Sequence, residues 1–185
     1  IPEDLESGDL SQYDTIVVGI RAYLSRDDLY QNNERLLKYV EDGGHLVVQY
    51  HKPEDRWNSS TTAPFKLVIG SPSIRWRVTD ENATVSLTKP DSSLFSFPNE
   101  IEDKDWENWT QERGLYYPME WAENYETFVS MADPNEAPFD GGILMTNYGK
   151  GTYLYTNLVL YRQIQSQVPG GYRIMTNLIS HGANN

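Results

Sequence analysis

Two short apolar runs stand out along the chain, and neither alternates with polar residues. The first spans residues 15–20 (Thr-Ile-Val-Val-Gly-Ile) and the second spans residues 46–48 (Leu-Val-Val). A run rich in β-branched residues and without alternation is typical of a strand that is buried on both faces, as in a parallel sheet. We therefore predict two parallel core strands at these positions.

The segment between the two runs has the periodicity of an amphipathic helix. Four apolar side chains fall on one helical stripe: Leu29, Leu36, Leu37 and Val40. Ser25, three residues before Asp28, is typical of a capping box, and Gly43-Gly44 stands where a left-handed C-cap is expected. The whole stretch predicts a βαβ unit with a right-handed crossover.

The rest of the chain is typical of strands that lead to one final helix. Residues 142–148 and 152–156 flank a Gly-Lys-Gly turn and predict a C-terminal β-hairpin. Residues 76–79 and 83–88 predict two strands around a polar turn, and residues 172–180 predict a closing helix.

Two stretches lack this periodicity, an acidic lead-in over residues 1–13 and a longer segment over residues 90–126. A stretch as long as the second is either functional or an irregular insertion. We predict one three-layer α/β domain over 1–185, with a mostly parallel sheet, a C-terminal β-hairpin and this insertion. The first residue is isoleucine, so we expect the domain to be part of a larger protein.

Composition narrows the function classes. The net charge of −12 disfavours nonspecific nucleic-acid binding, which needs clustered lysine and arginine. No apolar run is long enough to cross a membrane, so we predict neither a nucleic-acid nor a membrane partner. The chain has no cysteine, which removes thiol nucleophiles and cysteine-based metal sites but does not fix the compartment.

Polar side chains follow both predicted core strands. Because open sheets bind ligands beyond the carboxyl ends of their strands, residues 21–23 and 49–51 are expected to meet at one edge. Arginines next to aromatic residues can hold carboxylates or stack on rings, although salt bridges to the many acids explain them equally well. The candidate ligand-binding rim comprises Arg21, Tyr23, Tyr50, His51, Arg113 and Arg162.

Other constellations favour structural interpretations. The run 51–55 (His-Lys-Pro-Glu-Asp) suggests metal ligands, but a solvated loop fits it better, and His45 lies about 20 Å from His51 along an extended strand. A glycosidase could use two of the clustered acids, although a surface charge cluster is the default in so acidic a chain: Asp103, Asp105, Glu107 and Glu112. We assign no catalytic residue and no metal ligand.

As a set, several segments resemble the C-terminal region of large bacterial PIG-L (LmbE-like) deacetylases. They are 14–23 (DTIVVGIRAY), 43–50 (GGHLVVQY), 109–116 (WTQERGLY), 148–151 (YGKG) and the tail 162–180. That region is similar in turn to the flavodoxin-like, class I glutamine amidotransferase-like fold, including the ThuA-like proteins. In ThuA-like proteins a Gly-Gly strand also ends in a histidine, the place that His51 takes here.

The resemblance implies a non-catalytic accessory domain. Amidotransferases carry a nucleophilic cysteine near the position of His51, and this chain has none. The zinc-binding His-Pro-Asp-Asp-Glu motif of the deacetylases is also missing, so zinc-dependent de-N-acetylation is expected from a domain upstream of Ile1. The implied partners are that upstream domain and a glycan, and the segment itself is expected to need no cofactor.

Two alternatives stay open. The chain could be a ThuA-like enzyme that acts on a sugar at the rim around Arg21, His51 and Arg113. It could also be a purely structural oligomerisation module. The resemblance further implies a strand and a helix upstream, so that the edge of the sheet would need cover from that segment or from another chain.

Overall fold

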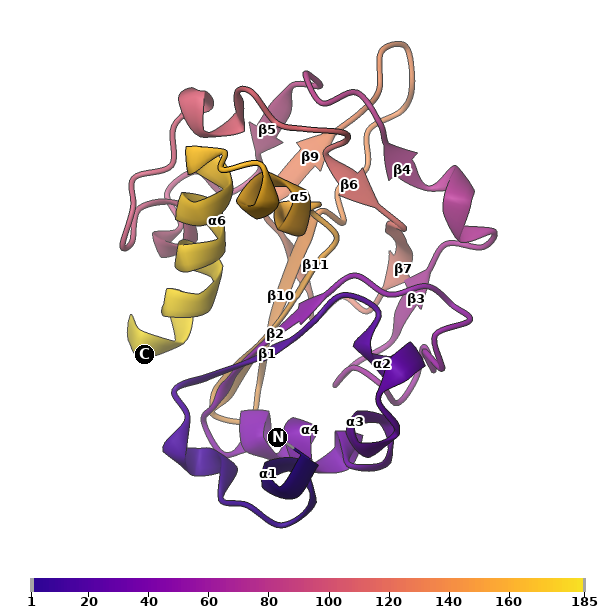
Figure 1. The fold of residues 1–185 in the computed structure, drawn as a ribbon, viewed down its shortest axis with the longest axis vertical. Helices are drawn as coiled ribbons and strands as arrows, with labels where there is room; N and C mark the ends of the chain where they lie inside the picture. The colour runs from indigo at the N-terminus through magenta and orange to yellow at the C-terminus, as the bar shows by residue number, and fades with distance from the viewer. Residues whose placement is uncertain (1, 185) are drawn as a thin grey trace.

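The structure, a computed structural model, describes residues 2–184, and their side chains through residue 182. A five-stranded sheet runs through its centre (Figure 1). In spatial order the strands are β1 (Thr15–Val18), β2 (His45–Gln49), β11 (Gly151–Thr156), β10 (Ile143–Tyr148) and β8 (Glu126–Thr127). The pairs β1–β2 and β2–β11 are parallel, whereas β11–β10 and β10–β8 are antiparallel.

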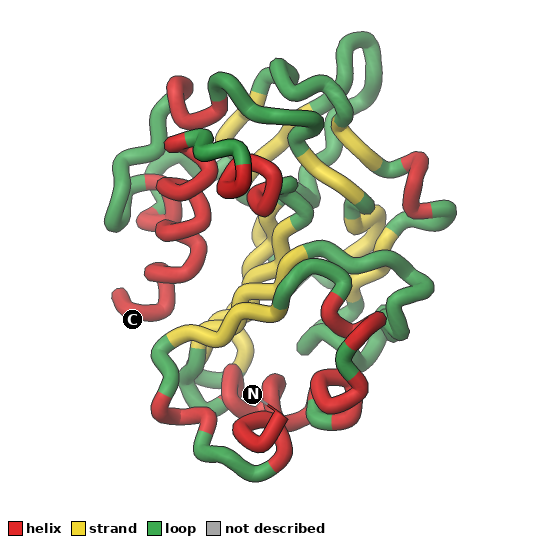
Figure 2. The backbone as a smooth tube through the Cα atoms, viewed as in Figure 1, coloured by secondary structure: helices red, strands yellow, loops and turns green. Residues whose placement is uncertain are grey.

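Helices pack against both faces of this sheet. On one face lie α2 (Ala22–Ser25), α3 (Asp27–Gln31) and α4 (Asn33–Glu41), and on the other lie α5 (Leu160–Gln165) and α6 (Pro169–Ser180) (Figures 1 and 2). Successive strand residues point to opposite faces, so β2 contributes to two apolar cores. Leu46 and Val48 pack with the α4 side, and Val47 packs with the α6 side.

Smaller elements surround the central sheet. Three two-stranded sheets join β3 (Leu67–Ile69) to β7 (Pro118–Trp121), β4 (Arg77–Val78) to β6 (Gly114–Leu115), and β5 (Val85–Leu87) to β9 (Val129–Met131). The short helices are α1 (Pro2–Glu6), η1 (Leu10–Gln12), η2 (Ser73–Arg75), η3 (Ser93–Phe95), η4 (Asp103–Trp106) and η5 (His181–Asn184).

The predicted α/β class, the βαβ unit and the C-terminal hairpin are confirmed. The first two strands pair in parallel, with Thr15 opposite His45, and β10 and β11 pair as the predicted hairpin. Along β2, the four residues from His45 to Val48 are buried, as the unbroken apolar run indicated. Within the described residues, no helix is long and apolar enough to span a bilayer.

The predictions for the N-terminal part were wrong in three details. In the described part of the chain β1 is an edge strand rather than a fully buried one, with a neighbouring strand on one side, and Val17 is 38% exposed. The acidic lead-in is not irregular, since α1 and η1 form there. Ser25 does not cap a helix, because the crossover breaks after it and Arg26 becomes the N-cap of α3.

The two strands predicted over 76–79 and 83–88 exist only in part and do not pair with each other. β4 pairs with β6 and β5 pairs with β9, both antiparallel. The partner strands lie tens of residues further along the chain, where Val129 and Met131 of β9 join the core of the α6 side and Leu115 of β6 joins the core of the α4 side. The segment 90–126, predicted as irregular, begins with 3-10 turns but ends in β6 and β7.

Candidate functional site

The loop after β1 turns sharply against the end of β2. Arg21 adopts a left-handed conformation with φ 50°, and its backbone N–H donates to the Tyr50 carbonyl at 2.9 Å. Its guanidinium donates to both carboxylate oxygens of Asp55, from Nε at 2.9 Å and from Nη2 at 2.7 Å. Asp55 is fully buried, so this ion pair ties the two loops together at the carboxyl end of the sheet.

His51 is a structural residue in this arrangement. Its side chain is 0% exposed, and both ring nitrogens have partners. Nδ1 lies 2.8 Å from the Gln49 carbonyl, and Nε2 accepts the Tyr23 backbone N–H at 3.2 Å. A carbonyl can only accept and an amide N–H can only donate, so the ring is neutral and protonated on Nδ1. Burial lowers the pKa of His51 to about 4.

Tyr23 lies beneath the surface with His51. Its ring is 1% exposed and contacts both His51 and Trp57, with centroids 5.0 and 6.2 Å away. Its hydroxyl donates to the Asn33 side chain at the start of α4. These two predicted rim residues therefore form the floor of the site and do not present groups to a ligand.

The exposed part of the site is a cluster that we call the tyrosine rim. Tyr116 and Tyr161 are half-buried, and Tyr50 is buried beside them. The Tyr50 and Tyr116 rings meet edge to face with centroids 5.4 Å apart, and burial, together with the nearby Tyr161, raises the pKa of Tyr50. The Lys52 ammonium lies 4.7 Å from the Tyr116 ring centroid. The tyrosine rim comprises Arg21, Lys52, Glu112, Tyr116, Tyr161 and Arg162, with Tyr50 below.

Arg162 and Glu112 close the rim on its far side. The Arg162 guanidinium lies 5.2 Å from the Tyr161 ring centroid and donates from Nη1 to the Gln111 side chain. The Nη2 atom is 3.6 Å from a Glu112 carboxylate oxygen, a distance too long for a hydrogen bond. Burial raises the pKa of Glu112, although Arg162 and Arg77 oppose the shift.

Left-handed backbone is concentrated at this site. Arg21, Gln111, Glu112 and Tyr116 have φ values of 50°, 43°, 82° and 56°. Side chains with a Cβ atom adopt this region rarely, and it persists only where the surrounding structure enforces it. Such outliers cluster at functional sites, which supports a role for this rim.

Arg113 is not part of the rim. It is 4% exposed, and its guanidinium donates to the carbonyls of Ala83, at 3.0 Å, and of Trp106. It also stacks near the Trp109 ring, 5.2 Å from the centroid, and burial lowers its pKa to about 10. Arg113 and Glu112 are neighbours in sequence but face opposite ways, which residue order alone could not reveal.

Sequence reasoning missed four rim residues, namely Lys52, Glu112, Tyr116 and Tyr161, as ligand-binding candidates. The sequence held a signal for two of them, because Lys52 directly follows the candidate His51 and Tyr161 directly precedes the candidate Arg162. Of the other clustered acids, Asp105 is buried and pairs with Arg173 at 2.8 Å, which is a structural role. His45 and His51 lie at opposite ends of β2, as predicted.

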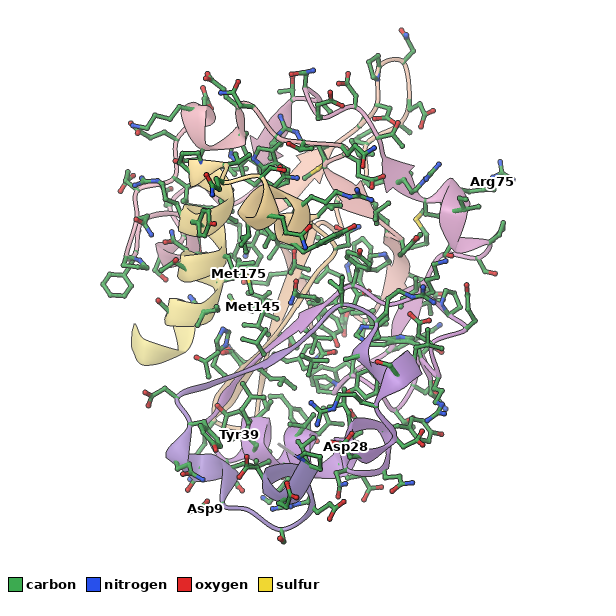
Figure 3. All side chains as sticks on the ribbon, viewed as in Figure 1. Asp9, Asp28, Tyr39, Arg75, Met145 and Met175 are labelled. Carbon is green, nitrogen blue, oxygen red and sulfur yellow. The ribbon has the colours of Figure 1, made fainter. Side chains whose placement is uncertain are left out.

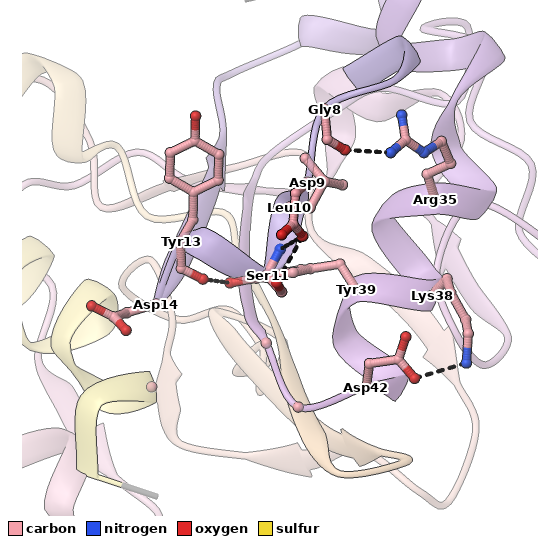
Figure 4. A pocket seen from close by; sticks show the side chains of 13 residues that line it. Gly8, Asp9, Leu10, Ser11, Tyr13, Asp14, Arg35, Lys38, Tyr39 and Asp42 are labelled. Atoms are coloured by element: carbon pink, nitrogen blue, oxygen red, sulfur yellow. Dashed lines mark hydrogen bonds and ion pairs between the residues drawn. The ribbon is translucent and has the colours of Figure 1, made fainter. Parts of the chain in front are cut away.

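A pocket of about 530 Å³ opens at the other end of the sheet, before β1 and β2 (Figure 4). Three of its larger polar side chains are already paired within the protein. Arg35 donates to the Gly8 carbonyl at 2.6 Å, Lys38 contacts Asp42 at 2.8 Å, and the Tyr39 hydroxyl donates to the Tyr13 carbonyl at 2.9 Å. Among residues 2–184, no cluster of three His, Asp or Glu side chains is arranged to hold a metal ion.

The sequence matches no protein-family model and no curated protein. Among solved structures, the chain is similar to the cytoplasmic protein STM3548 from Salmonella typhimurium, with a TM-score of 0.62 and 14% identity over 98% of this chain and 75% of that one. It is also similar to a beta-galactosidase from Rahnella sp. R3, with a TM-score of 0.48 and 17% identity over 92% of this chain and 24% of that one. At 14% identity, the first likeness shows a shared α/β fold alone.

Proposed function

We propose that this chain is a non-catalytic, class I amidotransferase-like accessory domain of a bacterial PIG-L/LmbE-like deacetylase, and that it binds carbohydrate at the tyrosine rim. Helices on both faces of a sheet that is parallel at β1, β2 and β11 support the finer three-layer assignment. The zinc-dependent chemistry would belong to the upstream domain of the same protein.

The state of His51 carries the proposal. A general base needs a ring nitrogen that can reach a substrate, and a metal ligand needs a free lone pair. In His51, the Nδ1 proton faces a carbonyl and the Nε2 lone pair faces an amide, both inside the core. The chain also lacks the cysteine that amidotransferases use near this strand end. The end of β2 would therefore serve as a scaffold that positions the side chains of a ligand-binding site.

The chemistry of the tyrosine rim suits a sugar. Half-buried tyrosine rings present an apolar face to the C–H groups of a pyranose, and nearby charged side chains bond its hydroxyls. Tyr116 and Tyr161 provide the rings, and Lys52, Glu112 and Arg162 provide donors and acceptors around them.

Oligosaccharide binding tests the proposal. The wild-type chain is screened against a glycan array, and its affinity for each hit is measured by isothermal titration calorimetry with Tyr116→Ala and Tyr172→Ala. Tyr172 is the matched control, since it is a tyrosine on α6 that is 46% exposed and lies outside the rim. Loss of a stacking ring is expected to weaken binding about tenfold in Tyr116→Ala only. If no oligosaccharide binds, the carbohydrate assignment is wrong.

The link to a deacetylase has its own test. Activity of the parent protein on N-acetylated sugars is compared with and without this region. A change in KM or kcat is expected if the domain presents substrate to the catalytic cleft, and unchanged kinetics would count against the accessory role.

A second candidate function is structural oligomerisation, which the exposed edge of the sheet favours. Within residues 2–184, β1 pairs only with β2, and Val17 and Ile20 are 38% and 36% exposed. Unpaired strand edges are templates for pairing with another chain. Sedimentation of the isolated chain as a monomer over a wide concentration range would exclude this function.

A further inference from the structure

Arg162 makes unusually little use of its guanidinium. Five N–H donors are available on this group, and among the described residues only Nη1 has a hydrogen-bond acceptor, the Gln111 side chain. Nε is buried without a hydrogen-bond partner in the described part of the chain, and Nη2 stands 3.6 Å from Glu112. The side chain remains 32% exposed, so a group from solvent can reach it.

The other arginines near the site each donate from two guanidinium nitrogens. Arg21 holds both oxygens of the buried Asp55, and Arg113 holds two backbone carbonyls. Their guanidinium groups therefore stabilise the fold. Arg162 differs because its neighbouring carboxylate, Glu112, stays beyond hydrogen-bond distance, 3.6 Å from Nη2. The Glu112 backbone is left-handed, with φ 82°.

Lys52 is a second cation with a weak internal partner. Its ammonium lies 3.8 Å from Glu54, which is itself mostly exposed, and it sits over the Tyr116 ring. Tyr116 packs on Tyr50, and Tyr161, the residue before Arg162, also lies near Tyr50. One continuous tyrosine surface thus has an under-used cation on each side.

Acidic side chains outnumber basic ones in this chain, with a net charge of −12. Nevertheless, neither Arg162 nor Lys52 comes within hydrogen-bond distance of a carboxylate among the described residues. Charge-assisted hydrogen bonds to carboxylates are about twice as strong as neutral ones, and arginine forms them with the best geometry. Carboxylates from outside the chain would give Arg162 and Lys52 the hydrogen-bond acceptors that they lack.

We propose that the saccharide bound at the tyrosine rim carries carboxylates, as in a uronic-acid oligosaccharide, and that Arg162 and Lys52 recognise them. This inference rests on the proposed carbohydrate function and names its ligand class. The pyranose rings lie along Tyr116 and Tyr161, one carboxylate takes hydrogen bonds from the Arg162 guanidinium, and another faces the Lys52 ammonium.

A matched pair of ligands tests the inference. Cellotetraose and cellotetrauronic acid differ only in the oxidation of C6, and the affinity of each is measured by calorimetry at low ionic strength. The uronic acid is expected to bind at least about tenfold more tightly, since a charged hydrogen bond contributes at about that level. That preference should shrink at high salt, because the pair is partly exposed.

Three variants locate the effect. Arg162→Gln is expected to remove most of the preference, and Arg162→Lys, which keeps the charge without the fork, should retain part of it. The control Arg75→Gln should change nothing, because Arg75 lies on η2, points into solvent (Figure 3) and, in the described part of the chain, bonds to no rim residue. Circular dichroism of each variant verifies its fold.

The outcomes separate the two proposals. Equal binding of both ligands, or a preference that Arg162→Gln leaves intact, overturns the acidic-saccharide inference while the carbohydrate function stands. If neither these ligands nor any glycan on the array binds, both proposals fail together. If only neutral glycans on the array bind, the function is supported and the inference is wrong.

Discussion

Acidification should destabilise the fold through His51, and the structure gives the size of the effect. The His51 ring is neutral and buried, with a pKa of about 4 compared with 6.5 for an unperturbed histidine. Between these values the unfolded chain binds a proton that the native chain excludes, so stability is lost as the pH falls from above 6.5 toward 4. From pH 7 to pH 5, His51 alone is expected to cost about 2 kcal/mol.

A variant isolates this contribution from other titrations. His45 is a second buried histidine with a pKa of about 4, and the carboxylates also change the charge of the chain. These groups titrate alike in wild type and in His51→Gln, so the difference between the two proteins reports His51. The variant itself should be less stable at pH 7, because it loses the two hydrogen bonds of the His51 ring and the ring's contacts with Tyr23 and Trp57.

The assay is urea denaturation followed by tryptophan fluorescence at pH 7, 6 and 5, with linear extrapolation to water. The free energy of unfolding of wild type should fall about 2 kcal/mol further than that of His51→Gln across this range. Parallel losses in the two proteins would refute the reasoning, since they would mean that His51 binds its proton equally well in the native and unfolded states. A catalytic histidine with an exposed nitrogen would behave in that way.

Two further perturbations test the packing at the two ends of the sheet. Asp55→Asn should lower the free energy of unfolding by about 1–3 kcal/mol, as measured by urea denaturation, because Arg21 loses its buried carboxylate; an unchanged value would mean that the pair does not join the two loops. Gly151→Ala should lower the free energy of unfolding by more than about 2 kcal/mol, since its Cβ would lie 2.2 Å from the Gly44 carbonyl. Gly19→Ala should stay within about 0.5 kcal/mol of wild type, because a Cβ there would have no atom within 4 Å. Equal melting temperatures of these two glycine variants would contradict the packing described.

The elements that the sequence predicted well share local causes. The run at residues 46–48 is apolar without alternation because β2 is central and covered by helices on both faces. The hairpin of β10 and β11 was predictable because its register depends on a short glycine turn. In each case the pattern reflects contacts close in sequence or a strand buried on both sides.

The failures depend on distant partners. β1 has the same apolar pattern as β2, and its place at the edge follows from the order of the whole sheet. β5 pairs with β9 across more than forty residues, which no local turn signal encodes. His51 was predicted on the rim from its position after a strand and Arg113 from its proximity to Tyr116 in sequence, yet tertiary packing buries both side chains.

The rim itself was half predictable. The carboxyl ends of parallel strands meet at one edge, which correctly placed Arg21 and Tyr50 together. Tyr116 reached that edge from the segment 90–126 through left-handed backbone at non-glycine residues, for which the sequence holds no signal. The proposed binding site at this edge therefore includes a segment whose path the periodicity of the sequence could not predict.

The central claim is that ligands bind at the carboxyl end of the sheet, on the tyrosine rim. An NMR titration of the ¹⁵N-labelled chain with cellotetrauronic acid, or with the best glycan from the array, tests it directly. The account predicts that amide shifts concentrate at Arg21, Lys52, Tyr116 and Arg162, with no change around Tyr39. Shifts confined to the pocket before β1 and β2 would contradict it.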